Sequence, residues 1–132
     1  MLQFMLDTDT ASYIINSRYP STSRKFAQNF DQVCISCTTE AELRFGALRR
    51  KNRRLIEKVD AFCQAIPCLA WNSIAAQKYA ELRTCLEGQG KLIGAMDMMI
   101  AAAALAEDLT LVTNNIAHFS RVPKLKLENW VE

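Results

Sequence analysis

Apolar residues along this chain follow two alternating patterns. Short apolar runs at 2–6, 32–36, 68–71 and 109–113 are separated by longer segments in which apolar residues recur every three or four positions. The short runs are typical of strands covered on both faces, and the longer segments of helices with one buried side. A further short run at 125–127 predicts a last strand after Pro123. Together they predict an α/β fold in three layers (α/β/α), with a central parallel sheet of four to five short strands.

The segments between these runs predict six helices with recognisable ends. Thr39 with Glu42 three residues later has the spacing of a capping box, which predicts the start of the helix that runs to Arg50. The segment 96–106 is so rich in Ala and Met that it must pack against other backbone on nearly all sides. We expect it to be the central helix. The other helices are expected at 11–18, from Ser21 or Ser23 to 30, at 52–66, and from 72 or 73 to 87.

Length and composition favour one compact unit. The chain has 132 residues, half of them hydrophobic, and no Pro-, Gly- or Ser-rich linker divides it, so we expect a single domain over 1–132. The N-terminal apolar run is too short and too soon acidic for a secretory signal, and no stretch has the length needed to span a bilayer. We therefore expect a cytoplasmic protein with no membrane partner.

Five cysteines, an odd number without a secretory signal, are expected to be reduced thiols. Cys34 and Cys37 have the two-residue spacing of a zinc or redox pair, but no second pair follows at the spacing of a zinc finger. The more economical interpretation is that Cys34 fills a core position on a buried strand, because a free cysteine behaves as a small hydrophobe.

Three acids and one amide stand where the predicted elements meet. Asp7 follows the first strand, Glu42 begins the helix after the second strand, and Asp97 opens the apolar helix. Asn115 follows the strand at 109–113. Each acid alone is also explained as a helix cap, since a carboxylate near a helix N-terminus gains about 0.3–1 kcal/mol. Open α/β sheets, however, gather ligand-binding groups at the carboxyl ends of their strands.

Carboxylates that converge repel one another unless a cation lies between them. Oxygen ligands with open positions select a hard ion such as Mg²⁺ or Mn²⁺. Such an ion can activate a water molecule and stabilise the leaving oxygen of a phosphodiester. The pattern of Asp7, Glu42 and Asp97 therefore predicts metal-assisted phosphoryl hydrolysis.

The positive charge is concentrated although the formal net charge is only +2. A basic segment from Arg44 to Lys58 contains seven of the 16 lysines and arginines, and a cluster of this density can neutralise phosphates. A solvated helix end or a docking surface for an acidic partner explains the same pattern, and both alternatives remain open. The candidate RNA or partner contacts are Arg44, Arg49, Arg50, Arg53, Arg54 and Lys91.

Four segments, in order, carry a family resemblance. FMLDTDT, ISCTTEAELRFGA, QGKLIGAMDMMIAAAAL and LTLVTNNIAHF resemble the four ordered blocks of PIN-domain nucleases, and in particular the VapC-type toxins of type II toxin–antitoxin systems. The similarity extends over nearly the whole chain, to the terminal LENWV. It implies a Mg²⁺- or Mn²⁺-dependent endoribonuclease that cuts structured RNA, such as a tRNA or rRNA loop. It also implies inhibition by a cognate VapB-like antitoxin and a homodimer that can enter a larger toxin–antitoxin assembly.

By position, the resemblance implies roles for individual residues. Asp7, Glu42 and Asp97 would be the metal-binding and catalytic acids, and Thr113 would orient a ligand or water. Asn115 stands among the catalytic positions where many family members have a further Asp, which leaves one-metal and two-metal action open. Asp9 is interpreted mainly as a helix cap beside the site. The single histidine, His118, is expected to be a surface or packing residue.

Two other interpretations remain. The motif LDTDTA also fits a haloacid-dehalogenase-like phosphatase in which Asp7 would attack phosphorus and Asp9 would act as acid and base. The later segment IGAMDMM, however, has only one of the two acids that such an enzyme needs. A non-catalytic binding module, in which the acids are caps and the basic segment contacts a partner, predicts no metal dependence.

Overall fold

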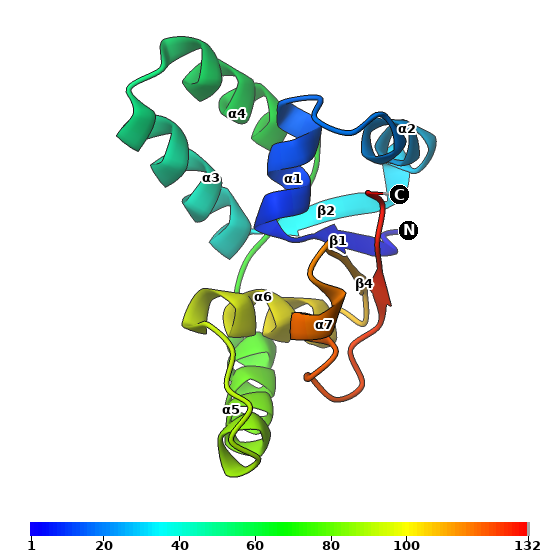
Figure 1. The fold of residues 1–132 in the computed structure, drawn as a ribbon, viewed down its shortest axis with the longest axis vertical. Coiled ribbons are helices and arrows are strands. Elements are labelled where there is room, and N and C mark those ends of the chain that lie inside the picture. The colour runs from blue at the N-terminus through cyan, green and yellow to red at the C-terminus, as the bar shows by residue number, and fades with distance from the viewer. Residues whose placement is uncertain (132) are drawn as a thin grey trace.

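The computed structural model describes residues 1–131 and shows an α/β fold built on a five-stranded parallel sheet (Figure 1). The strand order is β3-β2-β1-β4-β5, so the first strand lies in the middle and pairs with both β2 and β4. This confirms the predicted fold class. The strands are β1 (Phe4–Leu6), β2 (Val33–Ser36), β3 (Cys68–Leu69), β4 (Thr110–Val112) and β5 (Leu127–Glu128).

Helices cover both faces of the sheet. In Figure 1, α1 to α4 lie on one side of the sheet and α5 to α7 on the other, and α3 and α4 form a hairpin that projects beyond it. The bounds are α1 (Thr8–Ile15), α2 (Pro20–Gln28), α3 (Cys37–Arg50), α4 (Arg53–Ala65), α5 (Ser73–Gly88), α6 (Ala95–Ala106) and α7 (Ile116–Phe119). Within residues 1–131, none of these helices has the length and apolar character needed to cross a bilayer.

Alternate residues of the strands enter two separate hydrophobic cores. Phe4 and Leu6 of β1 pack with α1, α3 and α4, whereas Met5 packs with α5 and α6. This division follows from the two-residue repeat of a strand, which sends neighbouring side chains to opposite faces. Both faces are apolar, as the continuous apolar runs predicted. Cys34 of β2 is fully buried, which confirms its predicted core role, while Cys37 is exposed at the start of α3.

The Ala-rich helix is the central helix, as predicted. Residues 100–104 of α6 are all buried, and the helix packs against α5, α3, β2 and β4. Its alanines have little side chain to hold neighbouring backbones apart, so α6 lies close to its neighbours. Asp97 lies in the first turn of this helix, and its side chain is partly exposed.

Two helices begin earlier than predicted, because the last residue of the preceding strand region serves as the cap. Asp7 accepts a hydrogen bond from the Thr10 amide at 2.8 Å, so α1 starts at Thr8 rather than at 11. Ser36 accepts from the Thr39 amide at 3.2 Å, so α3 starts at Cys37. The predicted capping box was therefore wrong, and Glu42 lies in the second turn of α3 instead of its first.

Two short elements were not predicted. They are the 3₁₀ turn Phe30–Gln32 before β2 and α7 after β4. Elements of three or four residues are too short to show a hydrophobic period, so the sequence pattern could not reveal them. The second of them, α7, helps to build the site described next.

Candidate active site

Asp7 is the buried acid of the site. It directly follows β1, and its backbone amide donates to the Val112 carbonyl of β4 at 3.0 Å. Only 5% of its surface is exposed. Because β1 and β4 are parallel and in register, Asp7 lies beside Thr113 at the carboxyl ends of both strands. This is the edge at which open α/β sheets bind ligands.

Glu42 reaches this edge from α3. The Thr8 hydroxyl, in the first turn of α1, donates a hydrogen bond to Glu42 Oε1 and lies 3.4 Å from the Thr39 hydroxyl. Thr8 therefore fixes the orientation of the Glu42 carboxylate next to the residue that follows Asp7. The two acids are 35 positions apart in the chain, and the contact between α1 and α3 brings them together.

Asp97 is tied to the same edge through α7. His118 Nε2 lies 3.0 Å from Asp97 Oδ2, so the imidazole and the carboxylate share a hydrogen bond. The helix that carries His118 begins after Asn115, whose amide donates to the Thr113 hydroxyl at 3.0 Å. A continuous path of bonded groups thus leads from Asp7 through Thr113 and α7 to Asp97. His118 also packs edge-on against Phe119, as expected of a packing residue, but the sequence did not predict its bond to Asp97.

Asn115 contributes its backbone rather than its side chain to this path. It occupies the N-cap position of α7, where its side chain makes no capping hydrogen bond, and it is exposed. Asp9 is likewise exposed in the first turn of α1 and is not its cap, since Asp7 has that role. Both side chains are free to point into solvent near the buried carboxylate.

Burial raises the pKa of the Asp7 carboxyl above its ordinary value. Hydrogen bonds from the Thr113 hydroxyl and the Thr10 amide lower the pKa and offset part of that shift. Removing water disfavours the ionised form of a carboxyl, and a nearby cation restores it. The ionised Asp7 is thus a costly group in the protein alone and a strong ligand for a cation.

Because the ionised Asp7 carboxylate destabilises the folded protein when no cation is bound, we expect Asp7→Asn to stabilise the metal-free protein at neutral pH. A raised pKa in the folded state means that the native protein loses stability as pH rises from the ordinary value of 3.8 through the raised pKa. Asn removes this loss and can still cap α1. In chelator, Asp7→Asn should raise Tm by a few degrees at pH 7 and by much less at pH 4. A matched substitution at the exposed Asp31 should leave Tm unchanged at both pH values, and an equal gain at pH 4 would contradict the argument.

The donor set fits a hard cation. Carboxylate, hydroxyl and amide oxygens surround the edge, and the imidazole of His118 is engaged by Asp97. Such oxygen ligands suit Mg²⁺ or Mn²⁺. Among residues 1–131, the only group of three or more acidic, thiol or imidazole ligand atoms within 4.8 Å of one another lies elsewhere, so these acids are not tightly clustered. An ion held by these acids would therefore retain several water ligands, as Mg²⁺ usually does.

A groove with a volume of about 430 Å³ lies beside Glu42, between α1, α3 and α4. Thr8, Asp9 and Glu42 line one part of it, and Arg49 and Arg50 line another. Its remaining walls are mainly apolar and include Ile15, Leu43, Ala47, Leu55 and Val59. The groove therefore joins two of the predicted contact arginines to the candidate active site.

The other predicted contacts lie outside this groove. Arg44 is bonded to Glu40 at 2.8 Å and to Asp60 at 3.3 Å, so its charge is already neutralised by two acids. Arg53 is exposed and 3.7 Å from Glu57. Arg54 and Lys91 are also exposed, and neither lines the groove.

Comparisons with known proteins show the family of the chain. The family model described as the PIN domain matches residues 4–125. Ribonuclease VapC2 of Haemophilus influenzae is 39% identical over 132 residues, which cover 99% of this chain and 100% of that protein. The chain belongs to the VapC ribonucleases of the PIN-domain family. It is thus the toxin component of a VapBC toxin–antitoxin system.

Further VapC proteins resemble the chain over its full length. The tRNA(fMet)-specific endonuclease VapC of Shigella flexneri is 35% identical and covers 98% of this chain, with 99% of its own length matched. The crystal structure of VapBC2 from Rickettsia felis, bound to a DNA fragment from its promoter, superposes with a TM-score of 0.91 at 36% identity. That match covers 98% of this chain and 99% of the VapC chain.

Within this VapC site, sequence reasoning missed two groups. It did not identify Thr8 as the partner of Glu42, or His118 as the partner of Asp97. It did place Thr113 at the site, but through the family resemblance. The presence of His118 one turn into a short helix after Asn115 could have suggested a role near the strand edge, yet nothing in the sequence links it to Asp97.

Proposed function

We propose that this VapC chain, acting as a single domain over 1–132, is a Mg²⁺- or Mn²⁺-dependent endoribonuclease. In this proposal Asp7, Glu42 and Asp97 hold the ion. The observation that supports it best is the buried carboxylate of Asp7 at the carboxyl end of the central strand, with Glu42 and Asp97 held toward the same edge by Thr8 and His118. A buried acid without a cationic side chain beside it is expected where a metal ion completes the charge balance.

A divalent ion at these acids would supply an activated water nucleophile and stabilise the charge that develops on the phosphodiester. The residues of this chain would place the groups around it. Asp7 offers a poorly hydrated carboxylate, and the Thr113 hydroxyl limits its rotation. Thr8 holds Glu42, and His118 holds Asp97, so none of the three carboxylates turns freely. Asn115 would complete the site as a neutral ligand or through water.

The substrate in this proposal is a structured RNA, and the tRNA specificity named for the Shigella flexneri relative makes a tRNA the first candidate. Single-stranded loops present bases and phosphates that a small domain can reach. Arg49 and Arg50 would contact phosphates at one end of the groove, while Glu42 lines its other end beside the proposed metal site. The protein would act in the cytoplasm as a homodimer, inhibited by a cognate VapB-like antitoxin, as the complex from Rickettsia felis suggests.

The test is cleavage of total cellular RNA by the purified chain, freed of any antitoxin, with Mg²⁺ or Mn²⁺ and with a chelator as control. We expect discrete internal fragments that disappear in the chelator and return when Mg²⁺ is added in excess. Sequencing of the new ends would then identify the cut site. If the RNA stays intact but a small phosphomonoester is hydrolysed, the result would support the phosphatase alternative. If neither the RNA nor the phosphomonoester is hydrolysed, the result would support a binding module.

The groove arginines give a second prediction. Arg49→Ala combined with Arg50→Ala should weaken RNA binding, measured in Ca²⁺ to prevent cleavage. A plot of the logarithm of the RNA association constant against the logarithm of salt concentration has a negative slope. The magnitude of this slope should decrease by about 1.4, since each phosphate contact to a single strand contributes about 0.7.

The matched control changes Arg53 and Arg54, which belong to the same basic segment but do not line the groove. That pair should reduce the slope by less. Equal effects of the two pairs would show that the segment acts as a diffuse charge, and no effect of either pair would remove it from the RNA interface.

A further inference from the structure

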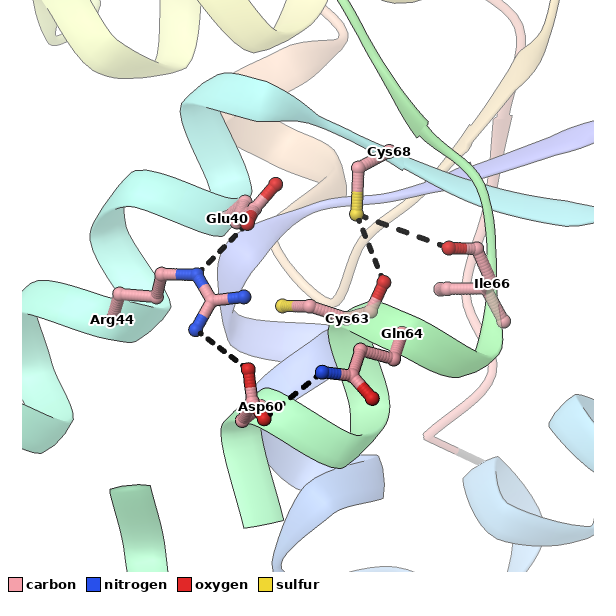
Figure 2. A network of polar contacts seen from close by, with 7 residues as sticks. All are labelled: Glu40, Arg44, Asp60, Cys63, Gln64, Ile66 and Cys68. Carbon is pink, nitrogen blue, oxygen red and sulfur yellow. Dashed lines mark hydrogen bonds and ion pairs between the residues drawn. The ribbon is translucent and has the colours of Figure 1, made fainter. Parts of the chain in front are cut away.

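A second group of potential metal ligands lies on the hairpin side of the sheet, and no part of the proposed nuclease chemistry uses it. Glu40 of α3, Cys63 of α4 and Cys68 of β3 each place one ligand atom within 4.8 Å of the other two. Figure 2 shows the two sulfur atoms and the carboxylate turned toward a common space between the three elements. They come from positions up to 28 residues apart in the chain, so only the fold brings them together.

The separation of these atoms is close to that of a tetrahedral zinc site. Bonds of about 2.3 Å to sulfur place the ligand atoms of such a site about 3.8 Å apart. The three ligand atoms here lie within 4.8 Å of one another. Small side-chain rotations that bring them about 1 Å closer would reach the zinc geometry. Cys63 is buried, whereas Cys68 and Glu40 are half-buried, so an ion would have an entry path and room for a water as fourth ligand.

The charges around the cluster can be balanced. The Arg44 guanidinium donates to Glu40 Oε2 at 2.8 Å, which leaves Oε1 as a ligand atom. Two thiolates and the Glu40 carboxylate would be matched by a divalent cation together with Arg44. The second partner of Arg44, Asp60, is half exposed and lies 3.3 Å away. Arg44 would thus serve as a counter-ion in the site rather than as a competitor for it.

The thiols are protonated when no ion is bound. Burial raises the pKa of Cys68 to about 12, and burial also raises the pKa of Cys63, which Arg44 partly offsets. The Cys68 thiol then donates to the Cys63 carbonyl, with a sulfur–oxygen distance of 3.4 Å. A thiol is a weak donor, so losing this bond on metal binding costs little. An ion that prefers sulfur would displace both protons, as happens in thiolate metal sites.

We propose that Glu40, Cys63 and Cys68 bind a thiophilic divalent cation such as Zn²⁺, with the fourth position open to water. Sulfur ligands favour Zn²⁺ over the hard ions expected at Asp7, so the two sites would select different metals. The ion would join α3 to the end of α4 and to the edge strand β3. Since α3 also carries Glu42, two residues after Glu40, the bound ion would stabilise the helix that supplies the third acid.

The probe is Co²⁺, added to the full chain in the presence of excess Mg²⁺, which occupies oxygen-ligand sites. Thiolate coordination gives Co²⁺ an intense sulfur-to-metal charge-transfer absorption that oxygen ligands do not give. We expect this band in the wild-type chain, and its loss when Zn²⁺ is added. Cys68→Ser should abolish it, whereas Glu40→Gln should keep it with weaker affinity.

Cys85→Ser is the matched control, because Cys85 is also half-buried but lies on α5, away from the cluster. It should leave the band unchanged. A second readout uses the wild-type chain alone. Zn²⁺ should slow alkylation of Cys68 by about tenfold or more, since a ligated thiolate is not free to react. The exposed Cys37 should react at the same rate with and without Zn²⁺. Absence of the band in the wild-type chain, or its persistence in Cys68→Ser, would overturn the proposal.

Discussion

Asp97→Asn should lower the rate of RNA cleavage by at least about 10²–10³-fold, the loss seen when a single group that stabilises transition-state charge is removed. In the proposed mechanism Asp97 is a ligand of the divalent ion. The substitution keeps the size and shape of the side chain but replaces a charged ligand with a neutral one. The affinity for the ion and the activation of its bound water should both fall.

The fold should tolerate this change. Asp97 lies in the first turn of α6, where a carboxylate contributes about 0.3–1 kcal/mol through the helix dipole. Asn can still share a hydrogen bond with His118 Nε2. We therefore expect a Tm within a few degrees of that of the wild-type chain, measured in the same buffer as the cleavage rate.

The control is Asp31→Asn, at an exposed position before β2, at the opposite end of the strands from the acids. It should cleave RNA at the wild-type rate. If Asp97→Asn retained most of its activity with added Mg²⁺, the assignment of the site would fail. A loss of activity accompanied by unfolding would instead place Asp97 among the groups that stabilise the fold.

Trp130→Ala should lower the free energy of unfolding by about 3–5 kcal/mol, the range for removing a buried aromatic side chain. Trp130 is 1% exposed. Its ring packs edge-on against Phe4 of β1, with 5.2 Å between ring centroids, and its Nε1 donates to Glu128 at 2.9 Å. Its carbonyl accepts from the Thr22 hydroxyl at 2.8 Å, so it also anchors α2.

This loss is a large part of the roughly 5–15 kcal/mol that stabilises a typical domain. Tm should fall by about 10–20 °C in thermal unfolding, and urea unfolding should show an earlier midpoint with an unchanged slope. Trp130→Phe is the matched variant, since it keeps an aromatic ring and loses the bond to Glu128. It should lose less than half as much stability. A loss below 1 kcal/mol for the alanine variant would show that the C-terminal segment contributes little to the core.

The hydrophobic pattern predicted the fold class and most element positions because buried strands and amphipathic helices have different periods. The runs at 2–6 and 109–113 correspond to β1 and β4, and the Ala-rich segment corresponds to α6. The helix starts were less predictable. Asp7 and Ser36 cap their helices because each strand leads directly into a helix, and the competing motif of Thr39 and Glu42 could not be rejected from the sequence.

The sequence alone supplied the acids Asp7, Glu42 and Asp97, their order, and the family to which the chain belongs. The acids could be proposed because Asp7 directly follows an apolar strand and Asp97 opens an apolar helix, whereas the family came from the resemblance of four segments. Tertiary structure decided which groups touch. The pairs Thr8–Glu42 and His118–Asp97 each join segments more than 20 residues apart.

The group of Glu40, Cys63 and Cys68 illustrates the same division. The sequence drew attention to Cys34 and Cys37, whose spacing is familiar, yet the fold buries one on a strand and exposes the other on a helix. The strand order places β3 beside β2, and the return of α4 along α3 brings two distant thiols to one carboxylate. The sequence determines which residue types are present and where they stand in the chain. The distances between distant segments depend on strand order and helix packing, which a local sequence pattern does not reveal.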